Sequence, residues 1–187
     1  SVTKSYAVQL SVYLASSSVY AQAYTFTTLA GYPGLGSADG VGSGAQFAGP
    51  LGVGADSAGN IYVADSGNST VRKVSPAGVV STIAGLAGSK GSSDGTNSAA
   101  RFSRPTGLAL DGAGNIFLTD SNNCTIRKIT ADGMVTTLAG SPGQWGFANG
   151  TGGAAQFKNP RAVAVDGSNN VFVAEYGSFT IRKITPA

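Results

Sequence analysis

The hydrophobic residues in the middle of the chain fall into short runs that turn residues separate. Between Arg104 and Gly140 these runs are rich in Val, Ile, Leu, Thr and Phe and hold no internal proline, a composition that favours β-strands. None continues for ten residues without a glycine, so helices are not predicted. With Gly and Asp in the turns between them, the runs predict four strands of one antiparallel sheet, over Leu108–Asp111, Ile116–Asp120, Thr125–Ile129 and Met134–Leu138.

The same pattern recurs along the chain with a spacing of 55 residues. A proline, a phenylalanine and an arginine mark each copy, at Pro50, Pro105 and Pro160, at Phe47, Phe102 and Phe157, and at Arg72, Arg127 and Arg182. Such a spacing indicates a repeat architecture in which each unit buries its apolar faces against its neighbours. Because four-stranded units that repeat radially are the blades of a β-propeller, we predict an all-β protein. It is a β-propeller segment of three four-stranded antiparallel blades, at about 50–85, 105–140 and 160–187.

The residues of the second and third strands resemble the NHL repeat family. In the first copy the resemblance rests on Gly59-Asn-Ile-Tyr-Val-Ala-Asp65, then Asn68, then Val71-Arg-Lys-Val74. The second copy matches equally, whereas the third has Glu175 in place of the Asp and Ser178 in place of the Asn. The resemblance covers about residues 25–187 and implies part of a six-bladed propeller. Such propellers mostly serve as binding platforms for very varied partners, so the resemblance implies a fold more than a function.

Residues 1–24 lie outside the repeats and permit two interpretations. Lys4, an apolar stretch and Ala21-Gln-Ala23 are similar to the end of a secretory signal, with cleavage before Tyr24. This interpretation predicts a secreted, periplasmic or cell-surface protein. The alternation of apolar residues at Tyr6, Val8, Leu10, Val12 and Leu14 instead favours a half-buried strand.

Residues 25–31 match the last strand of a repeat, although no other strand of a repeat precedes them. At the other end, the third copy supplies only its first three strands before Ala187. We expect residues 25–31 to form a strand that completes a blade elsewhere, which would cover an exposed sheet edge. Three blades do not close, because propellers carry about 4–8 of them. The ring is therefore completed by further blades of a longer chain, or by a homodimer that forms a six-bladed ring.

An acidic residue ends the second strand of every copy, seven residues before the arginine of the third strand. The pairs are Asp65 with Arg72, Asp120 with Arg127, and Glu175 with Arg182. The acidic type remains even where Asp changes to Glu. We therefore predict a structural, bidentate carboxylate–guanidinium pair across each hairpin. The other interpretation is a catalytic or ligand-binding carboxylate.

The composition excludes several kinds of chemistry. There is no histidine and a single cysteine, Cys124, among 187 residues, so a Ser-His-Asp triad and a zinc site are not expected. The connecting loops repeat one acidic or amide residue, Asp39, Asp94 or Asn149, which is too few ligands for calcium. We expect no metal and no cofactor. No apolar run is long enough for a membrane span, and the basic residues belong largely to the repeated Arg-Lys pairs, which argues against nucleic acid.

The third copy differs from the second mainly by gaining aromatic residues. Its connecting loop has Trp145 and Phe147 where the second copy has Lys90 and Ser92. The turn after its second strand has Tyr176 and Phe179, and Arg161 follows Pro160. Antiparallel order brings these turns and the connecting loops to one end of a blade. Exposed aromatics with an arginine are typical of binding hot spots, although Phe147 and Phe179 are also suited to packing the loop down.

These observations predict a non-catalytic binding or interaction module with a protein or glycan partner. The binding residues are Trp145, Phe147, Arg161, Tyr176 and Phe179. A structural spacer in a larger surface protein is the alternative. A metal-assisted propeller lyase or hydrolase is a further one, since Asp56, Asp111 and Asp166 end the first strands; a turn-capping role suffices for these three.

Overall fold

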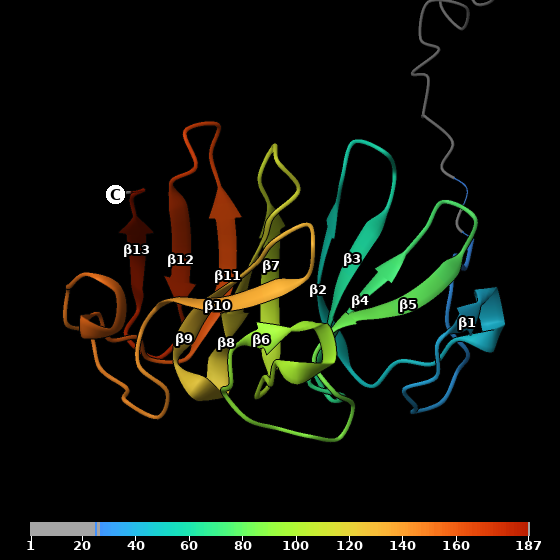
Figure 1. Ribbon diagram of the computed structural model, residues 1–187, viewed down its shortest axis with the longest axis horizontal. Coiled ribbons are helices and arrows are strands. Elements are labelled where there is room, and N and C mark those ends of the chain that lie inside the picture. The colour runs from blue at the N-terminus through green and yellow to red at the C-terminus, as the bar shows by residue number, and fades with distance from the viewer. Residues whose placement is uncertain (1–24, 26, 187) are drawn as a thin grey trace, which may run out of the picture.

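The computed structural model describes residue 25 and residues 27–186 of the protein. Both interpretations of residues 1–24 lie outside this part of the chain. The described residues form three antiparallel sheets that follow one another along the molecule (Figure 1). Four short 3-10 turns lie in the connections, namely η1 (Gly42–Gly44), η2 (Asn97–Ala99), η3 (Ser121–Asn123) and η4 (Gly152–Ala154).

Each sheet contains the strands of one repeat, and in the first two sheets the short first strand lies beside the last one. The first sheet consists of β1 (Gly40–Val41), β2 (Pro50–Ala55), β3 (Ile61–Asp65), β4 (Thr70–Val74) and β5 (Val79–Ala84). The second consists of β6 (Gly95–Thr96), β7 (Pro105–Leu110), β8 (Ile116–Asp120), β9 (Thr125–Ile129) and β10 (Met134–Ala139). The third has β11 (Pro160–Val165), β12 (Val171–Glu175) and β13 (Thr180–Ile184). The all-β fold with antiparallel blades is therefore confirmed.

The structure corrects the predicted strands in two places. The first strand of the second repeat begins at Pro105 rather than Leu108, because a register shift between Pro105 and Leu108 lets pairing with β8 start earlier. Proline is tolerated there as the first residue of a strand. In addition, each connecting loop of the first two repeats adds a two-residue strand: β1 pairs with β5, and β6 pairs with β10. These additions make the sheets five-stranded rather than four-stranded.

The described residues of 25–31 do not form the expected strand. Instead, the backbone N–H of Gly31 donates a hydrogen bond to Gly42 O, and that of Tyr32 donates to Ala45 O. A segment becomes a β-strand only when a neighbouring strand pairs with it. This segment lies beside its own connecting loop and not beside the third strand of a blade. The third sheet correspondingly has three strands and no fourth one against β13 among the described residues.

Adjacent sheets pack closely along their first strands. A Cβ added to Gly107 in β7 would lie 2.7 Å from the Cα of Ala162 in β11, so this glycine allows the two strands to approach. Phe102 fills the space between the first two sheets with Ala64, Val71 and Leu118. Phe157 does the same between the second and third sheets. The phenylalanine of the connecting loop thus joins neighbouring blades.

Candidate functional site

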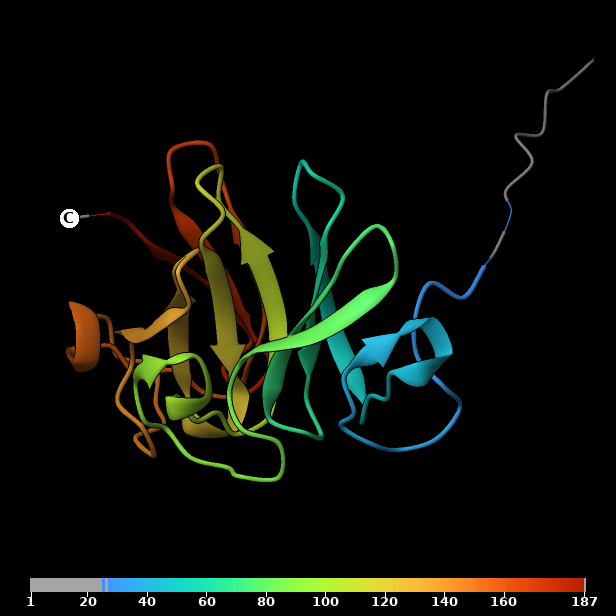
Figure 2. The same cartoon turned by 45° about the vertical axis from the view of Figure 1, so that its right-hand side comes forward.

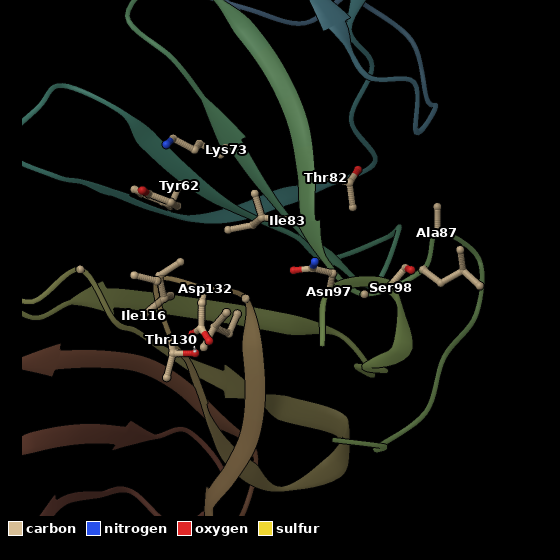
Figure 3. Close-up of a pocket in the computed structure, with 16 residues that line it drawn as sticks. Tyr62, Lys73, Thr82, Ile83, Ala87, Asn97, Ser98, Ile116, Thr130 and Asp132 are labelled. Atoms are coloured by element: carbon tan, nitrogen blue, oxygen red, sulfur yellow. Dashed lines mark hydrogen bonds between the residues drawn. The ribbon is translucent and has the colours of Figure 1, made fainter. Parts of the chain in front are cut away.

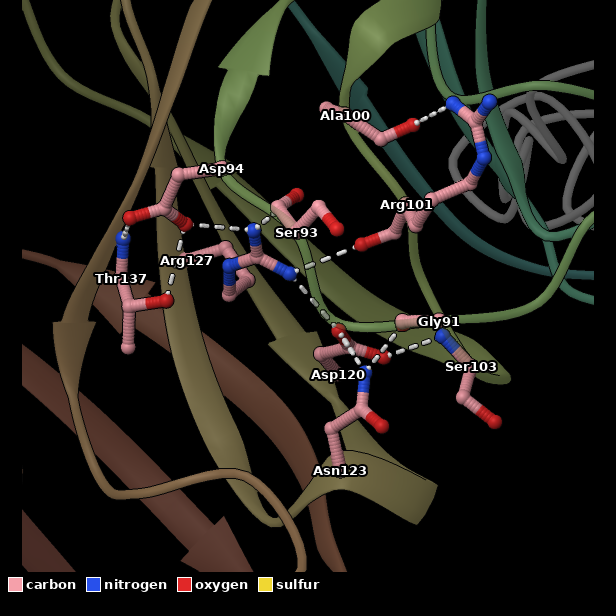
Figure 4. Close-up of polar contacts among 10 residues, drawn as sticks. All are labelled: Gly91, Ser93, Asp94, Ala100, Arg101, Ser103, Asp120, Asn123, Arg127 and Thr137. Carbon is pink, nitrogen blue, oxygen red and sulfur yellow. Dashed lines mark hydrogen bonds and ion pairs between the residues drawn. The ribbon is translucent and has the colours of Figure 1, made fainter.

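A buried arginine in the second repeat ties the sheet to its connecting loop (Figure 4). One nitrogen of Arg127, Nη1, lies 3.0 Å from Asp120 Oδ2 and also donates to the carbonyl of Arg101. The other, Nη2, lies 2.7 Å from Asp94 Oδ1 and donates to the carbonyl of Ser93. A single guanidinium therefore fixes two carboxylates and two loop carbonyls.

The first repeat has the same arrangement. Arg72 Nη1 lies 2.9 Å from Asp65 Oδ2, and Arg72 Nη2 lies 2.6 Å from Asp39 Oδ1. The predicted partners are thus in contact, but the predicted bidentate geometry is wrong. In the second repeat the reason is visible, because the backbone N–H of Ser103 occupies the other oxygen of Asp120, Oδ1, at 2.7 Å.

The third repeat retains the arginine–carboxylate pair, but fewer charged groups and hydrogen bonds surround it. Arg182 Nη1 lies 2.9 Å from Glu175 Oε1, whereas Arg182 Nη2 binds the neutral Asn149 at 2.7 Å. Asn123 donates both to Asp120 and to the carbonyl of Gly91 in the second repeat. Ser178, which takes the place of Asn123, bonds only Thr180 among the described residues. The Arg182 side chain is 13% exposed, while that of Arg127 is fully buried.

These clusters shift the pKa of their carboxyl groups in two directions. Burial raises the pKa of Asp120 to about 6, against the effects of Ser103, Asn123 and Arg127, which all favour its charged form. For Asp94, burial acts to raise the pKa, but hydrogen bonds from Thr137 and Arg127 outweigh it and hold the pKa below the usual value. The clusters attach the connecting loops to the sheets. Every carboxylate oxygen in them already accepts a hydrogen bond within the fold.

The acidic residues at the other end of the blades cap turns. Asp111 Oδ1 accepts hydrogen bonds from the backbone of Ala113 and Asn115, and its Oδ2 accepts one from the Asn115 side chain. Asp56 and Asp166 make the same set of bonds in their hairpins. Within the described part of the chain, no three His, Cys, Asp or Glu side chains come together as a group that could hold a metal ion.

The loops of the third repeat carry the most exposed aromatic side chains. Figure 2 shows the β2–β3, β7–β8 and β11–β12 hairpin turns projecting at one end of the molecule and the connecting loops at the other. We call this second end, which also holds the turns after β3, β8 and β12, the loop face. On it, Trp145 is 66% exposed, Phe147 77%, Tyr176 66% and Phe179 90%.

Two of these aromatic rings lie against cations. Lys158 Nζ lies 5.1 Å from the centroid of the Trp145 ring, and the guanidinium of Arg161 lies 5.3 Å from that of Tyr176. Asn159, which follows Lys158 in the chain, holds the second pair, because its side chain accepts a bond from Arg161 Nε and its carbonyl accepts one from the Tyr176 N–H. The turn and the loop therefore form one continuous surface.

Phe147 and Phe179 lie over no cation among the described residues. Phe147 lines a separate hollow of about 560 Å³ with Lys158 and Ile181. Phe179 has a positive φ of 60°, which is unusual for a bulky residue. Cys124 and Ser69 have the same backbone conformation at the equivalent positions. The turn geometry is thus shared by all copies, and the exposed aromatic ring is added only in the third.

Sequence reasoning missed Lys158. The equivalent residues are Ser103 and Ala48, so the comparison of copies that identified Trp145 would also have identified this lysine. Ser121, which occupies the position of Tyr176 in the second repeat, is buried, and its hydroxyl group bonds Thr106 and the carbonyl of Pro160.

A larger hollow lies elsewhere, between the first and second sheets (Figure 3). It has a volume of about 790 Å³ and contains none of the predicted binding residues. Lys73 and Asp132 are its charged lining residues, and Asp132 accepts a hydrogen bond from Thr130. It is a groove between blades, without a cluster of reactive side chains.

Comparison with known proteins agrees with this architecture. The family model of the NHL repeat matches residues 47–74 and 102–129. A crystal structure of a structural genomics protein of unknown function from Bacteroides thetaiotaomicron is 32% identical, with a TM-score of 0.63 over 67% of this chain and 32% of that one. An auxiliary nutrient binding protein from the same species is 20% identical, with a TM-score of 0.63 over 70% of this chain and 36% of that one.

A curated relative is the chloroplastic protein SUPPRESSOR OF QUENCHING 1 of Arabidopsis thaliana. It is 41% identical over 96 residues, which are 51% of this chain and 9% of that protein. The chain thus spans about a third of the solved structures and less of this relative. The chain thus carries two NHL repeats, at residues 47–74 and 102–129, within a β-propeller fold. In its described part, none of the helices has both the length and the apolar character to cross a membrane.

Proposed function

We propose that the protein is a non-catalytic binding module that takes its partner on the loop face of the third repeat. The observation that carries this proposal is the exposure of Trp145, Tyr176, Phe147 and Phe179 on loops that the Arg182 pair and backbone bonds hold in place. These large aromatic side chains are exposed and do not pack into the core of the fold. Aromatic residues of this kind dominate the binding energy at interfaces.

Two other functions have less support. A structural spacer needs no exposed aromatic rings, and the second repeat shows that the same fold forms with Lys90 and buried Ser121 at the equivalent positions. A metal-assisted lyase or hydrolase needs carboxylates that converge on a metal. Here Asp56, Asp111 and Asp166 accept hydrogen bonds within their own turns. A metal retained by the purified protein would favour the enzyme.

The module works as part of a larger ring. The outer side of the first sheet presents Phe47, Val53, Ile61 and Val63 around an apolar hollow. Their equivalents Phe102, Leu108, Ile116 and Leu118 are buried against the first sheet. A neighbouring blade therefore covers this side, either from a longer chain or from a second copy. Light scattering decides between them: a homodimer supports the second copy, and a stable monomer of this chain contradicts it.

The secreted, periplasmic or cell-surface location also remains a proposal. It rests on the Ala21-Gln-Ala23 signal. The N-terminal sequence of the exported product, which should begin at Tyr24, tests it.

Substitution of the aromatic residues tests the proposed function. A glycan array and a pull-down identify a partner, and titration then measures its affinity. We expect Trp145→Ala and Tyr176→Ala each to weaken binding by about 1–3 kcal/mol with little change in unfolding. Lys90→Ala is the matched control, since Lys90 occupies the position of Trp145 in the second repeat. If all three variants bind alike, the loops of the third repeat do not hold the partner.

A further inference from the structure

The two ends of the blades differ in their available charge. All nine acidic residues of the chain lie in its described part. Four of them, Asp56, Asp111, Asp132 and Asp166, lie in hairpin turns at the end opposite the loop face. Each of the other five forms an ion pair with Arg72, Arg127 or Arg182. These five are Asp39, Asp65, Asp94, Asp120 and Glu175.

The loop face therefore has cations that no carboxylate neutralises. Lys90, Arg101, Arg104, Lys158 and Arg161 lie in the connecting loops or directly after them. None forms a salt bridge within the described residues, where each ion pair uses Arg72, Arg127 or Arg182. Such a one-sided distribution attracts anionic ligands to this end and repels cationic ones.

Two of these cations line one cleft with an aromatic ring. The cleft has a volume of about 310 Å³ and lies between the turn after β8 and the third connecting loop. Arg104, Lys158 and Trp145 line it together with Ser121, Asn122, Cys124 and Asn159. Asn159 continues the surface to Arg161 and Tyr176. A ligand that runs along this line meets two cations, an indole, amide groups, a third cation and a phenol.

We infer that this cleft binds an acidic oligosaccharide, one whose sugar rings carry carboxylate groups. The inference rests on the proposed function and names its ligand. Carboxylates suit Arg104, Lys158 and Arg161, because hydrogen bonds between charged groups are about twice as strong as neutral ones. Sugar hydroxyl groups suit Asn122 and Asn159, whose amides both donate and accept. The apolar face of a pyranose ring packs on the exposed indole of Trp145.

An acidic peptide fits the cleft less well. Peptide recognition needs apolar pockets for side chains in addition to charge. Trp145 and Cys124 are the apolar side chains of this cleft, and no aliphatic side chain lines it. The groups present are amides, a hydroxyl and cations, which match the hydroxyl groups and carboxylates of a uronic acid.

Titration of the full chain with matched sugars tests the inference. The probes are short oligogalacturonates, alginate oligomers, the methyl ester of the same oligogalacturonate, a neutral cello-oligosaccharide and poly-glutamate. We expect a carboxylated sugar to bind with an affinity that falls as salt is added. The methyl ester, which keeps the sugar and loses the charge, binds at least about tenfold more weakly, a difference of roughly 1.4 kcal/mol.

Charge variants locate the ligand. We expect Lys158→Gln and Arg161→Gln each to weaken binding of the carboxylated sugar about three- to tenfold, as the loss of one typical hydrogen bond does. Lys73→Gln removes the same charge beside Tyr62, away from the cleft, and should leave affinity unchanged.

Several outcomes overturn the inference. Equal binding of the methyl ester, tighter binding of poly-glutamate, or no binding of any carboxylated sugar each contradicts it. If the neutral sugar binds instead and Trp145→Ala abolishes this, the inference fails while the proposed function stands. If the carboxylated sugar binds equally well to Trp145→Ala and to Lys158→Gln, both fail, because the ligand then lies elsewhere.

Discussion

The second and third repeats have the same strands but use their loops differently. In the second, Arg127 is buried between two carboxylates, and the equivalents of the aromatic residues are Lys90, Cys124 and the buried Ser121. In the third, one carboxylate has become Asn149 and the loops carry four exposed aromatic rings. The comparison shows that the residues common to the copies hold loops in place, whereas the residues that differ form an available surface.

The two repeats also differ in how well neighbouring groups stabilise them. The second repeat has a neighbouring sheet on each side, and its arginine binds two carboxylates. The third lacks the bonds of the Asn123 side chain and a fourth strand against β13 among the described residues. Regions that bind ligands are often less stable than the core that supports them. The following predictions test this contrast, from the largest expected effect on unfolding to the smallest.

Removal of the buried arginine should give the largest effect. We expect Arg127→Ala to lower the free energy of unfolding by about 3–5 kcal/mol, because it leaves two carboxylates without their cation. Arg127→Lys should also lower the melting temperature, since one ammonium group does not span Asp120 and Asp94. Arg182→Ala should have a smaller effect, because that side chain is partly exposed and pairs with a single carboxylate. Urea denaturation measures all three. Equal losses for Arg127→Ala and Arg182→Ala, or an unchanged Arg127→Lys protein, would contradict this account.

Exchange of the asparagine between repeats should have an intermediate effect. Asn123→Ser removes two hydrogen bonds and should cost about 1–2 kcal/mol. Ser178→Asn gives the third repeat the residue of the other two and should stabilise it, since Gly146 and Glu175 stand where Gly91 and Asp120 stand in the second. Thermal denaturation of both variants measures the changes. A destabilised Ser178→Asn protein would show that the third repeat is not a weakened copy of the second.

Asp94→Asn reproduces Asn149 in the second repeat and should have a small effect that depends on pH. The folded-state pKa of Asp94 lies below its usual value, so its contribution is present above the unfolded pKa and is lost as pH falls through the folded value. At neutral pH the variant should be less stable by less than about 1 kcal/mol, because the carboxylate is half exposed. This difference should shrink below about pH 4.

The contribution of Asp120 to stability changes with pH in the opposite direction. This group is present both in the original protein and in the Asp94→Asn variant. Its folded pKa of about 6 lies above the unfolded value, so this group stabilises the fold at low pH and loses that contribution as pH rises through about 6. Because Asp120 is present in both proteins, the difference between Asp94→Asn and the original protein reports mainly the titration of Asp94. A difference that grows as the solution is acidified would show that Asp94 is not the group responsible.

The sequence predicts the regular parts of the repeat well. The strands Ile116–Asp120 and Thr125–Ile129 have the predicted bounds, because alternation and turn residues determine both ends. It does not predict that pairing begins at Pro105, since this depends on a register shift. Nor does it show that Arg127 reaches Asp94, which lies 33 residues away, although both residues recur at the repeat spacing. Whether Phe147 and Phe179 pack onto the loop or face solvent depends on local contacts, which the sequence pattern does not contain.

The most direct test makes the third connecting loop resemble the second. The double variant Trp145→Lys, Phe147→Ser gives the third loop the residue types that the second repeat has at Lys90 and Ser92. It leaves the residues that bind Arg182 unchanged. Titration with the identified ligand, together with urea denaturation of the same protein, measures binding and stability in parallel. We predict that binding is weakened by about 1–3 kcal/mol or more while the free energy of unfolding changes by less than about 0.5 kcal/mol. Unchanged binding, or a loss of binding that merely follows a loss of stability, would contradict the claim that these loops carry the function.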